Sequence, residues 1–565
     1  MMMTKRYKLL GLLPLAFAST LGQAQSINEK LLEEVIEEKT KGITIGADLS
    51  KADRSAFSEA GAEPFIAIDK TDSLNVGISY MGSGGEWKLF LSNDGGVSWE
   101  ESTLNTLAIL DSLYPDHTLI GGGDPVFTFG ADHSIHVSWI YLHGTDLANP
   151  YNNTMECFYA VSNDFGETWS VKPYIHAGLL SSFDAIDRIW IDCDHSESDY
   201  EHNIYLTAVH FVASETGPAG QLIFRKNAAD DSFESAGIGG ILPPDGGQTQ
   251  FGNVAVDDYG NVHMSAAIIG GATGQVAYAR STDGGNTYTT YTIDAEASLD
   301  ATGPTINIHN RENAAVSLAV DGDNVYLAWT EFDTDGVQAY YVYSHDNGVS
   351  FSDRIEFSED LNGDFYAATM PCVAADNGHM VISWYLFDRE TLETKYIAGF
   401  SNDAGLSISA YETLSEPTDF SSEPTSHFYG DYNDADMSGC TAHFTWCDGS
   451  SGSPRVYHSS IIACGIGFGE ASIVEHTPVT DQLTIGTIYP NPVQSQLMLS
   501  VASEKSERIR FTIHDINGKK IQEYQETIQG NTLIELNVST LPEGTYLLKG
   551  ITEDGTFFTR KWIKA

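Results

Sequence analysis

Carboxylates and an arginine stand at the first position of a short apolar segment that recurs along the chain. The segment reads "EPFIAID" from Glu63, "DPVFTFG" from Asp124 and "RIWIDCD" from Arg188. A pair of carboxylates can supply the acid and the base of glycoside hydrolysis, and a neighbouring guanidinium can bind and orient a substrate. These positions are therefore the first candidates for a chemical site.

The same segment returns four more times with other residues in first place. The later copies begin at Phe251, Ala315, Met370 and Gly430, and successive copies start 55 to 64 residues apart. Most copies end in Asp, and after a turn each is followed by two further runs rich in β-branched and aromatic residues, which predict β-strands. A four-stranded unit of about sixty residues repeated seven times predicts an all-β fold, a seven-bladed β-propeller, with a six-bladed ring as the alternative.

A second phrase, Ser-x-Asp-x-Gly-x-x-aromatic, follows the third predicted strand in five of the units. In a tight turn the Asp accepts hydrogen bonds from backbone N–H groups, the Gly takes a positive φ, and the aromatic packs between sheets. These are requirements of a hairpin, so the boxes are interpreted as structural turns rather than as catalytic motifs. The predicted box residues are Asp94, Gly96, Trp99, Asp164, Gly166, Trp169, Asp283, Gly285, Tyr288, Asp346, Gly348, Phe351, Asp403 and Gly405.

In a propeller the first strand of each blade starts near the axis, on the face where the loops after the second strands also open. Small-molecule sites favour such a funnel. The predicted acid/base residues are Asp124 and Glu331, with Asp187 beside Arg188 as an oriented pair at the same site. Crowded carboxylates would have different pKa values, which separates the acid from the base.

Five residues are predicted to contact the substrate. The alternative is structural, because an arginine here can bridge neighbouring blades and acidic loops can be solvated or bind calcium. No cofactor is expected. Calcium binding by the acidic loops remains an alternative. The predicted substrate-binding residues are Arg188, Glu63, Asp431, Tyr432 and Arg389.

The N-terminus indicates an exported protein, and the net charge restricts the classes of partner. Basic residues precede an apolar run within residues 1–24, which is typical of a secretory signal peptide, and no other stretch is apolar for long enough to cross a bilayer. The formal net charge is −49 at pH 7, which disfavours nucleic acid and anionic membranes as partners. The six cysteines show no C-x-x-C spacing, so one or two disulfides are expected and a zinc site is not. The protein is expected to be a monomer.

The five boxes in register with the repeat resemble the Asp boxes of sialidases and their relatives with bacterial neuraminidase repeats. The resemblance covers residues 55–465 and implies a propeller of the sialidase superfamily. It also implies an Arg-Ile-Pro motif in the first blade and an arginine triad that grips a carboxylate. Here the first strand reads Glu63-Pro64-Phe65, and the triad is not found.

The C-terminal segment resembles a different family. "YPNP" from Tyr489, "NGKK" from Asn517 and "LPEGTY" from Leu541 resemble the sorting domain of type IX secretion in Bacteroidetes. This resemblance covers residues 485–565. It implies a small β-sandwich that directs the chain through the type IX machinery to the cell surface or the medium.

These observations divide the chain and leave three classes of function. A glycoside hydrolase or lyase acting on extracellular glycans is favoured, with the hydrolase preferred. The alternatives are a non-catalytic propeller that binds glycan or protein in the manner of an adhesin, and a structural exoprotein with no specific small ligand. The predicted organisation is a signal peptide at 1–24, a helix and lead-in strand at 25–54, the propeller at 55–465, a linker at 466–484 and the sorting domain at 485–565.

Overall fold

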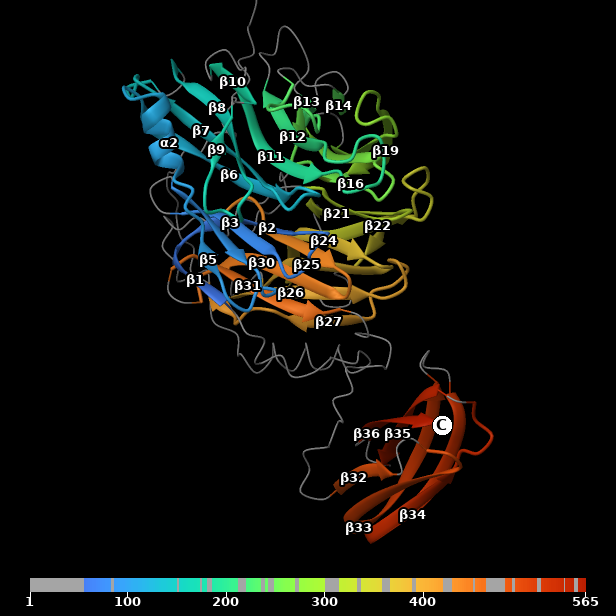
Figure 1. Ribbon diagram of the computed structural model, residues 1–565. Coiled ribbons are helices and arrows are strands. Elements are labelled where there is room, and N and C mark those ends of the chain that lie inside the picture. The colour runs from blue at the N-terminus through green and yellow to red at the C-terminus, as the bar shows by residue number, and fades with distance from the viewer. Residues whose placement is uncertain are drawn as a thin grey trace, which may run out of the picture.

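The computed structural model gives a nearly all-β chain (Figure 1). The signal peptide, the helix and lead-in strand expected within residues 25–54, and Arg389 lie outside the described residues. The structure describes residues 55–82, 86–149, 152–172, 175–179, 185–211, 220–234, 239–241, 248–269, 274–299, 315–332, 337–357, 366–388, 393–419, 429–450, 453–463, 483–489, 493–515, 520–542, 544–552 and 557–564.

The described part of residues 55–462 forms seven antiparallel sheets. The first three sheets, in chain order, are β2 (Ala62–Ile68), β3 (Val76–Met81), β4 (Trp87–Ser92) and β5 (Glu100–Glu101); β6 (Thr118–Phe129), β7 (Ile135–Gly144), β8 (Thr154–Ser162), β9 (Ser170–Val171) and β10 (His176–Leu179); and β11 (Ala185–Cys193), β12 (Ile204–Phe211), β13 (Gly220–Lys226) and β14 (Gly239–Ile241).

The remaining four sheets repeat this order, with the innermost strand first. They are β15 (Gln248–Gln250), β16 (Val254–Val256), β17 (Val262–Ile269), β18 (Gly274–Ser281) and β19 (Thr289–Ala297); β20 (Ser317–Asp321), β21 (Asn324–Phe332), β22 (Val337–Ser344) and β23 (Ile355–Glu356); β24 (Tyr366–Asp376), β25 (His379–Asp388), β26 (Glu393–Ser401), β27 (Ala410–Thr413) and β28 (Thr418–Asp419); and β29 (Asp434–Ser438), β30 (Thr441–Asp448), β31 (Arg455–Ile462) and β1 (Ser55–Ala60).

The innermost strands close into a ring. Each contacts the innermost strand of the next sheet, in the order β2, β6, β11, β16, β20, β24 and β29, and β29 contacts β2 again. The sheets are therefore blades around one axis, numbered 1 to 7 from β2 onward. The predicted all-β propeller class is confirmed.

The ring is closed by a strand from the N-terminal side of the propeller. β1 pairs antiparallel with β31, with Ser55 opposite His458, so the last blade takes its fourth strand from residues far away in sequence. The repeat left the last blade without a fourth strand of its own, and the N-terminal region, for example residues 43–49, could supply it. Residues 43–49 lie outside the described residues, and the strand that closes the blade is Ser55–Ala60.

Apolar side chains fill the space between neighbouring blades. The second strands contribute Trp139, Trp329, Trp384 and Trp446, each less than 2 % exposed. Large rings suit this position because adjacent twisted sheets leave a wide gap between their faces. Burial of this apolar surface is what holds the blades in contact.

The five boxes form one repeated turn between the third and fourth strands. In the first box Asp94 accepts hydrogen bonds from the backbone N–H and the hydroxyl of Ser98 (2.8 and 2.6 Å), and Gly96 donates its N–H to Ser92 Oγ at 2.9 Å. Gly96 has φ +85°, a conformation that costs glycine little. The other four boxes repeat these bonds around Asp164, Asp283, Asp346 and Asp403.

Aspartates near the ends of the innermost strands link neighbouring blades. Asp436 Oδ2 accepts the backbone N–H of Ile68 at 2.8 Å, and Asp192 Oδ2 accepts that of Val256, also at 2.8 Å. An edge amide facing the next blade has no sheet partner, and a buried unpaired N–H is costly. These two aspartates therefore pair backbone N–H groups across the seams between blades.

The C-terminal sheet is a separate unit with its own core. It consists of β32 (Leu483–Tyr489), β33 (Gln496–Asp515), β34 (Lys520–Asn537), β35 (Gly544–Thr552) and β36 (Phe557–Lys564). Leu499, Phe511, Leu548 and Trp562 are fully buried in it.

Candidate functional site

Six of the seven aligned first positions of the repeat, all but Ala315, share an unusual backbone conformation. A left-handed φ is costly for any residue with a side chain, by about 1–3 kcal/mol, and persists only where the surroundings enforce it. The β2, β6, β11 and β24 ladders also shift register next to these positions. The residues are Glu63 (φ 54°), Asp124 (50°), Arg188 (54°), Phe251 (35°), Met370 (54°) and Gly430 (102°).

Two of the predicted site carboxylates bridge blades at these bulges. Asp124 Oδ2 accepts the backbone N–H of Arg188 at 2.7 Å, and Glu63 Oε1 accepts the backbone N–H of Asp431 at 3.3 Å. All four residues come from the sequence-predicted set, so the structure does bring them together. Their contacts, however, are hydrogen bonds that join neighbouring blades of the propeller.

Asp124 lies among other acids. Its side chain is buried, and burial raises its pKa well above the usual range, as do the charges of Asp187 and Glu63 and a hydrogen bond with Asp187. Asp187 on β11 is only half-buried. A neutral buried acid beside a more exposed carboxylate is the arrangement from which general acid catalysis can be built.

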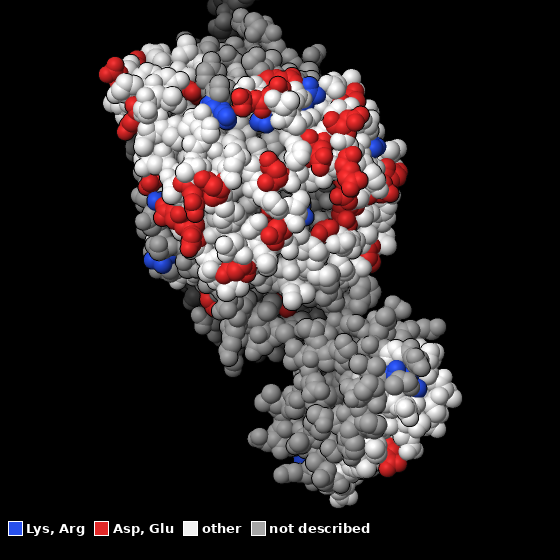
Figure 2. All heavy atoms as spheres, viewed as in Figure 1, with Lys and Arg blue, Asp and Glu red and all other residues white. Residues whose placement is uncertain are grey.

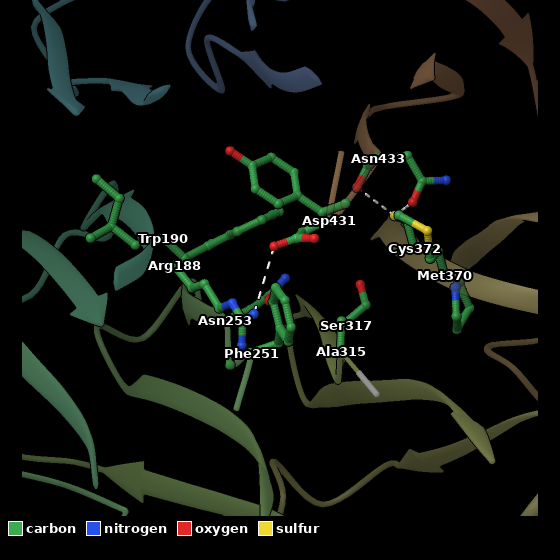
Figure 3. A pocket seen from close by; sticks show the side chains of 14 residues that line it. Arg188, Trp190, Phe251, Asn253, Ala315, Ser317, Met370, Cys372, Asp431 and Asn433 are labelled. Atoms are coloured by element: carbon green, nitrogen blue, oxygen red, sulfur yellow. Dashed lines mark hydrogen bonds and ion pairs between the residues drawn. The ribbon is translucent and has the colours of Figure 1, made fainter. Parts of the chain in front are cut away.

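Arg188 is held on the axis by an aromatic ring and a carboxylate. Its guanidinium carbon lies 3.6 Å from the centroid of Phe251, and Nη2 lies 3.6 Å from Oδ2 of Asp431 (Figure 3). Its buried Nε has no hydrogen-bond partner among the described residues. A cation–π contact of this kind contributes about 0.5–2 kcal/mol, so Arg188 fastens blades 3, 4 and 7 together.

A small cavity lies on the axis beside Arg188. Its volume is about 30 Å³, which is room for one or two water molecules but not for a sugar ring. The labelled side chains of Figure 3 converge on it from five blades. Its lining is Arg188, Ile189, Trp190, Phe251, Gly252, Asn253, Ala315, Ser317, Met370, Pro371, Cys372, Asp431, Tyr432 and Asn433.

Tyr432 faces this cavity as a neutral phenol. It is 6 % exposed, and its hydroxyl has no hydrogen-bond partner among the described residues. Burial and the nearby Asp124, Glu63 and Asp431 carboxylates raise its pKa well above 10. Phenolate chemistry is therefore disfavoured here.

The residues that we call the axial cluster are Glu63, Asp124, Asp187, Arg188 and Asp431. Glu331 is not part of this cluster. It lies at the end of β21, where its Oε1 accepts hydrogen bonds from Trp329 Nε1 (3.0 Å) and Arg354 Nη1 (2.8 Å), and its Oε2 accepts the N–H of Ser298 (3.2 Å). None of these partners belongs to the axial cluster around Asp124. The structure therefore does not bring Asp124 and Glu331 together as an acid/base pair.

Several lining residues were missed by sequence reasoning. Asn253, Ser317 and Cys372 stand two places after aligned first positions, and Asn433 stands three places after Gly430. Side chains two apart in a strand share a face, so counting two onward from each aligned start would have found the first three.

The cysteines and acidic groups give no metal site in the described chain. Cys157, Cys193, Cys372 and Cys447 are buried free thiols, and Cys440 is disulfide-bonded. No three His, Cys, Asp or Glu side chains within the described ranges gather as a ligand set for a metal ion. Acidic side chains nevertheless outnumber basic ones on the propeller face seen in Figure 2.

The C-terminal unit has a known counterpart. Residues 487–565 match the family described as "Secretion system C-terminal sorting domain". This segment is a type IX sorting domain. The sorting domain directs the chain to the cell surface or the extracellular space, and it implies contact with the type IX secretion machinery. None of the described helices is both long and apolar enough to span a membrane.

The propeller has structural neighbours with very different sequences. A protein of unknown function from Dyadobacter fermentans is 12 % identical, covers 61 % of this chain and 96 % of its own, and has a TM-score of 0.40. The Hadza microbial sialidase Hz136 is 12 % identical, with 69 % and 74 % covered and a TM-score of 0.37. A PL25 ulvan lyase is 10 % identical, with 72 % and 95 % covered and a TM-score of 0.42. No curated protein sequence matches the chain.

Proposed function

We propose that this exported propeller binds extracellular glycans without cleaving them, at the rim of the face on which the first strands begin. The observation that carries the proposal is the small volume of the pocket on the axis. Arg188 lies over Phe251 and against Asp431, and the cavity beside it has a volume of only about 30 Å³. A sugar ring has no room there, so ligand contacts fall to the rim.

The use of the axial carboxylates supports the same proposal. Glu63 and Asp124 each accept a backbone N–H from another blade. The two carboxyl groups of a glycosidase usually stand about 5 to 10 Å apart, with the sugar between them. Asp124 instead hydrogen bonds directly with Asp187, which leaves no space for a substrate between the two.

A glycoside hydrolase is the second candidate, and one observation favours it. Burial and the charges of Asp187 and Glu63 raise the pKa of Asp124, as is required of a general acid at neutral pH. In this candidate Asp124 protonates the leaving oxygen, Asp187 acts as base or nucleophile, and Arg188 orients the sugar.

A glycan array and a turnover assay on the exported chain separate the two candidates. The informative variants are Arg188→Met, which removes the charge, and Asp124→Asn, which retains an acceptor for the Arg188 N–H. Asp94→Asn, in a box turn, is the matched control. Rim binding predicts that all three variants bind the same glycans as the wild type and that none releases sugar.

Two results would count against rim binding. Turnover by the wild type that Asp124→Asn lowers by a factor of about 100 or more, while Asp94→Asn retains it, would establish the hydrolase. Loss of glycan binding in Arg188→Met alone would move the ligand site to the axis.

A further inference from the structure

A helix and the short segment after it cover the flank of blade 2. Helix α2 (Thr106–Leu113) begins at Asn105, whose side chain accepts the N–H of Ala108, and Figure 1 places it beside β7 and β8. Leu110 is 2 % exposed and packs into the blade-2 core. Thr106 Oγ1 lies 2.6 Å from the hydroxyl of Tyr141 on β7. We call residues 105–117 the strap.

The strap ends in a chain of hydrogen bonds between titratable groups. His117 Nδ1 lies 2.9 Å from His143 Nδ1, and His143 Nε2 lies 3.1 Å from Oε2 of Glu156. His143 and Glu156 are 1 % and 2 % exposed, whereas His117 is half-buried. The ring of Tyr114 packs against both imidazoles, with centroids 5.1 and 4.6 Å away.

The geometry limits the number of protons that can lie between His117 Nδ1 and His143 Nδ1. An ionised Glu156 accepts a hydrogen bond, so His143 Nε2 carries a proton. Only one proton fits between two nitrogens 2.9 Å apart, because one of them must supply the lone pair. The docked strap therefore needs at least one of the two facing Nδ1 atoms to be unprotonated.

We propose that the His117–His143 contact is a one-proton lock that holds the strap on blade 2 and opens it in acid. When both imidazoles are cationic, each Nδ1 carries a proton, and the hydrogen bond is replaced by repulsion between like charges. Histidine is the side chain whose charge responds to mild acid. Protonation of both rings is therefore the event that releases the strap.

The groups that face the His117–His143 contact determine how strongly two imidazolium charges repel each other there. From β8, Glu156 supplies a single negative charge, which can compensate one imidazolium but not two. The rings of Tyr114 from the strap and Phe158 from β8 are neutral, and Phe158 contacts His143 with a centroid separation of 5.9 Å. Since His143 is buried, solvent screens the repulsion poorly.

Hydrogen–deuterium exchange of the exported chain tests the lock. The backbone N–H groups of Ile109 and Tyr114, bonded to Asn105 O and Leu110 O at 3.1 and 2.8 Å, report on docking. After correction for intrinsic exchange, protection of these amides in the wild type should fall about tenfold between about pH 7.5 and about pH 5. Protection of β21 should not fall over the same range, which excludes global unfolding.

His117→Gln supplies the matched variant. A glutamine amide can donate to His143 Nδ1 but cannot take up a proton, so this variant should keep its strap protection at both pH values. Unchanged protection in the wild type, or an equal loss in the wild type and His117→Gln, would overturn the proposal. Both readouts are independent of glycan binding.

Discussion

The backbone N–H of Arg188 donates to Oδ2 of Asp124 over 2.7 Å, although the two residues belong to neighbouring blades and lie 64 positions apart. Both have a left-handed backbone, with φ 54° and 50°. Bulged first strands and a carboxylate between them thus form one joint. The primary role of these two charged residues at the axis is therefore to hold neighbouring blades of the propeller together.

This joint predicts different effects for two substitutions of Asp124. Asp124→Ala leaves the buried N–H of Arg188 without an acceptor and should lower the free energy of unfolding by about 1–3 kcal/mol. Asp124→Asn retains an acceptor oxygen and should lower it less. Urea denaturation of the two variants beside the wild type measures the difference, and equal losses would contradict a role in the joint.

The protonation of Asp124 predicts a pH dependence of stability. Its folded-state pKa is raised by burial and by the charges of Asp187 and Glu63. A raised pKa contributes stability below the unfolded value of the group, and this contribution is lost as the pH rises through the folded value. Glu63→Gln keeps an acceptor for Asp431 but removes one charge, so its stability should fall less with rising pH. Thermal melts across pH would show whether the two curves differ.

Glu412 predicts a second and separable pH effect. It lies on β27, 7 % exposed, and burial raises its pKa to about 8. Stability should therefore decline between the unfolded pKa of a glutamate, about 4.3, and pH 8. Glu412→Gln should flatten the decline across this window, as followed by the melting temperature. A decline of the same size in the variant would exclude Glu412 as its source.

Two turn glycines, Gly405 in a box and Gly378 between β24 and β25, predict a cost of substitution that depends on space as well as on backbone conformation. Gly405 has φ +80°, and an added Cβ would lie 2.7 Å from the ring of Tyr326; Gly378 has φ +75°, but an added Cβ would meet nothing within 4 Å. Gly378→Ala should cost about 1–2 kcal/mol of unfolding free energy for the strained φ alone. Gly405→Ala should cost more, by urea denaturation, and glycan binding should survive in both.

The sorting domain predicts where a truncated chain accumulates. Removal of residues 485–565 deletes the whole segment that matches the sorting family, together with its separate core. The truncated protein should remain in the periplasm with its propeller folded, as cell fractionation and protease resistance would show. Undiminished appearance of the truncated protein at the cell surface would contradict the assignment.

Much of the fold was readable from the sequence because the repeat is local. Seven copies of a short strand, and turns built from Ser, Asp and Gly within eight residues, are set by neighbours along the chain. The tail was equally clear, because its motifs lie in one continuous segment. Even the alignment of first positions was informative, since most of the aligned residues share a left-handed φ.

The tertiary structure decided what those residues do. Whether Asp436 is solvated or caps an amide depends on Ile68, which lies 368 positions away and meets it only when the ring closes. Glu331 and Asp124 were paired by sequence because both were expected at one funnel, yet Glu331 is committed to Trp329 and Arg354. The sequence by itself determined the strands, turns and export of this protein. Which charges meet was decided by the closure of the blades, because these contacts join segments that no local pattern relates.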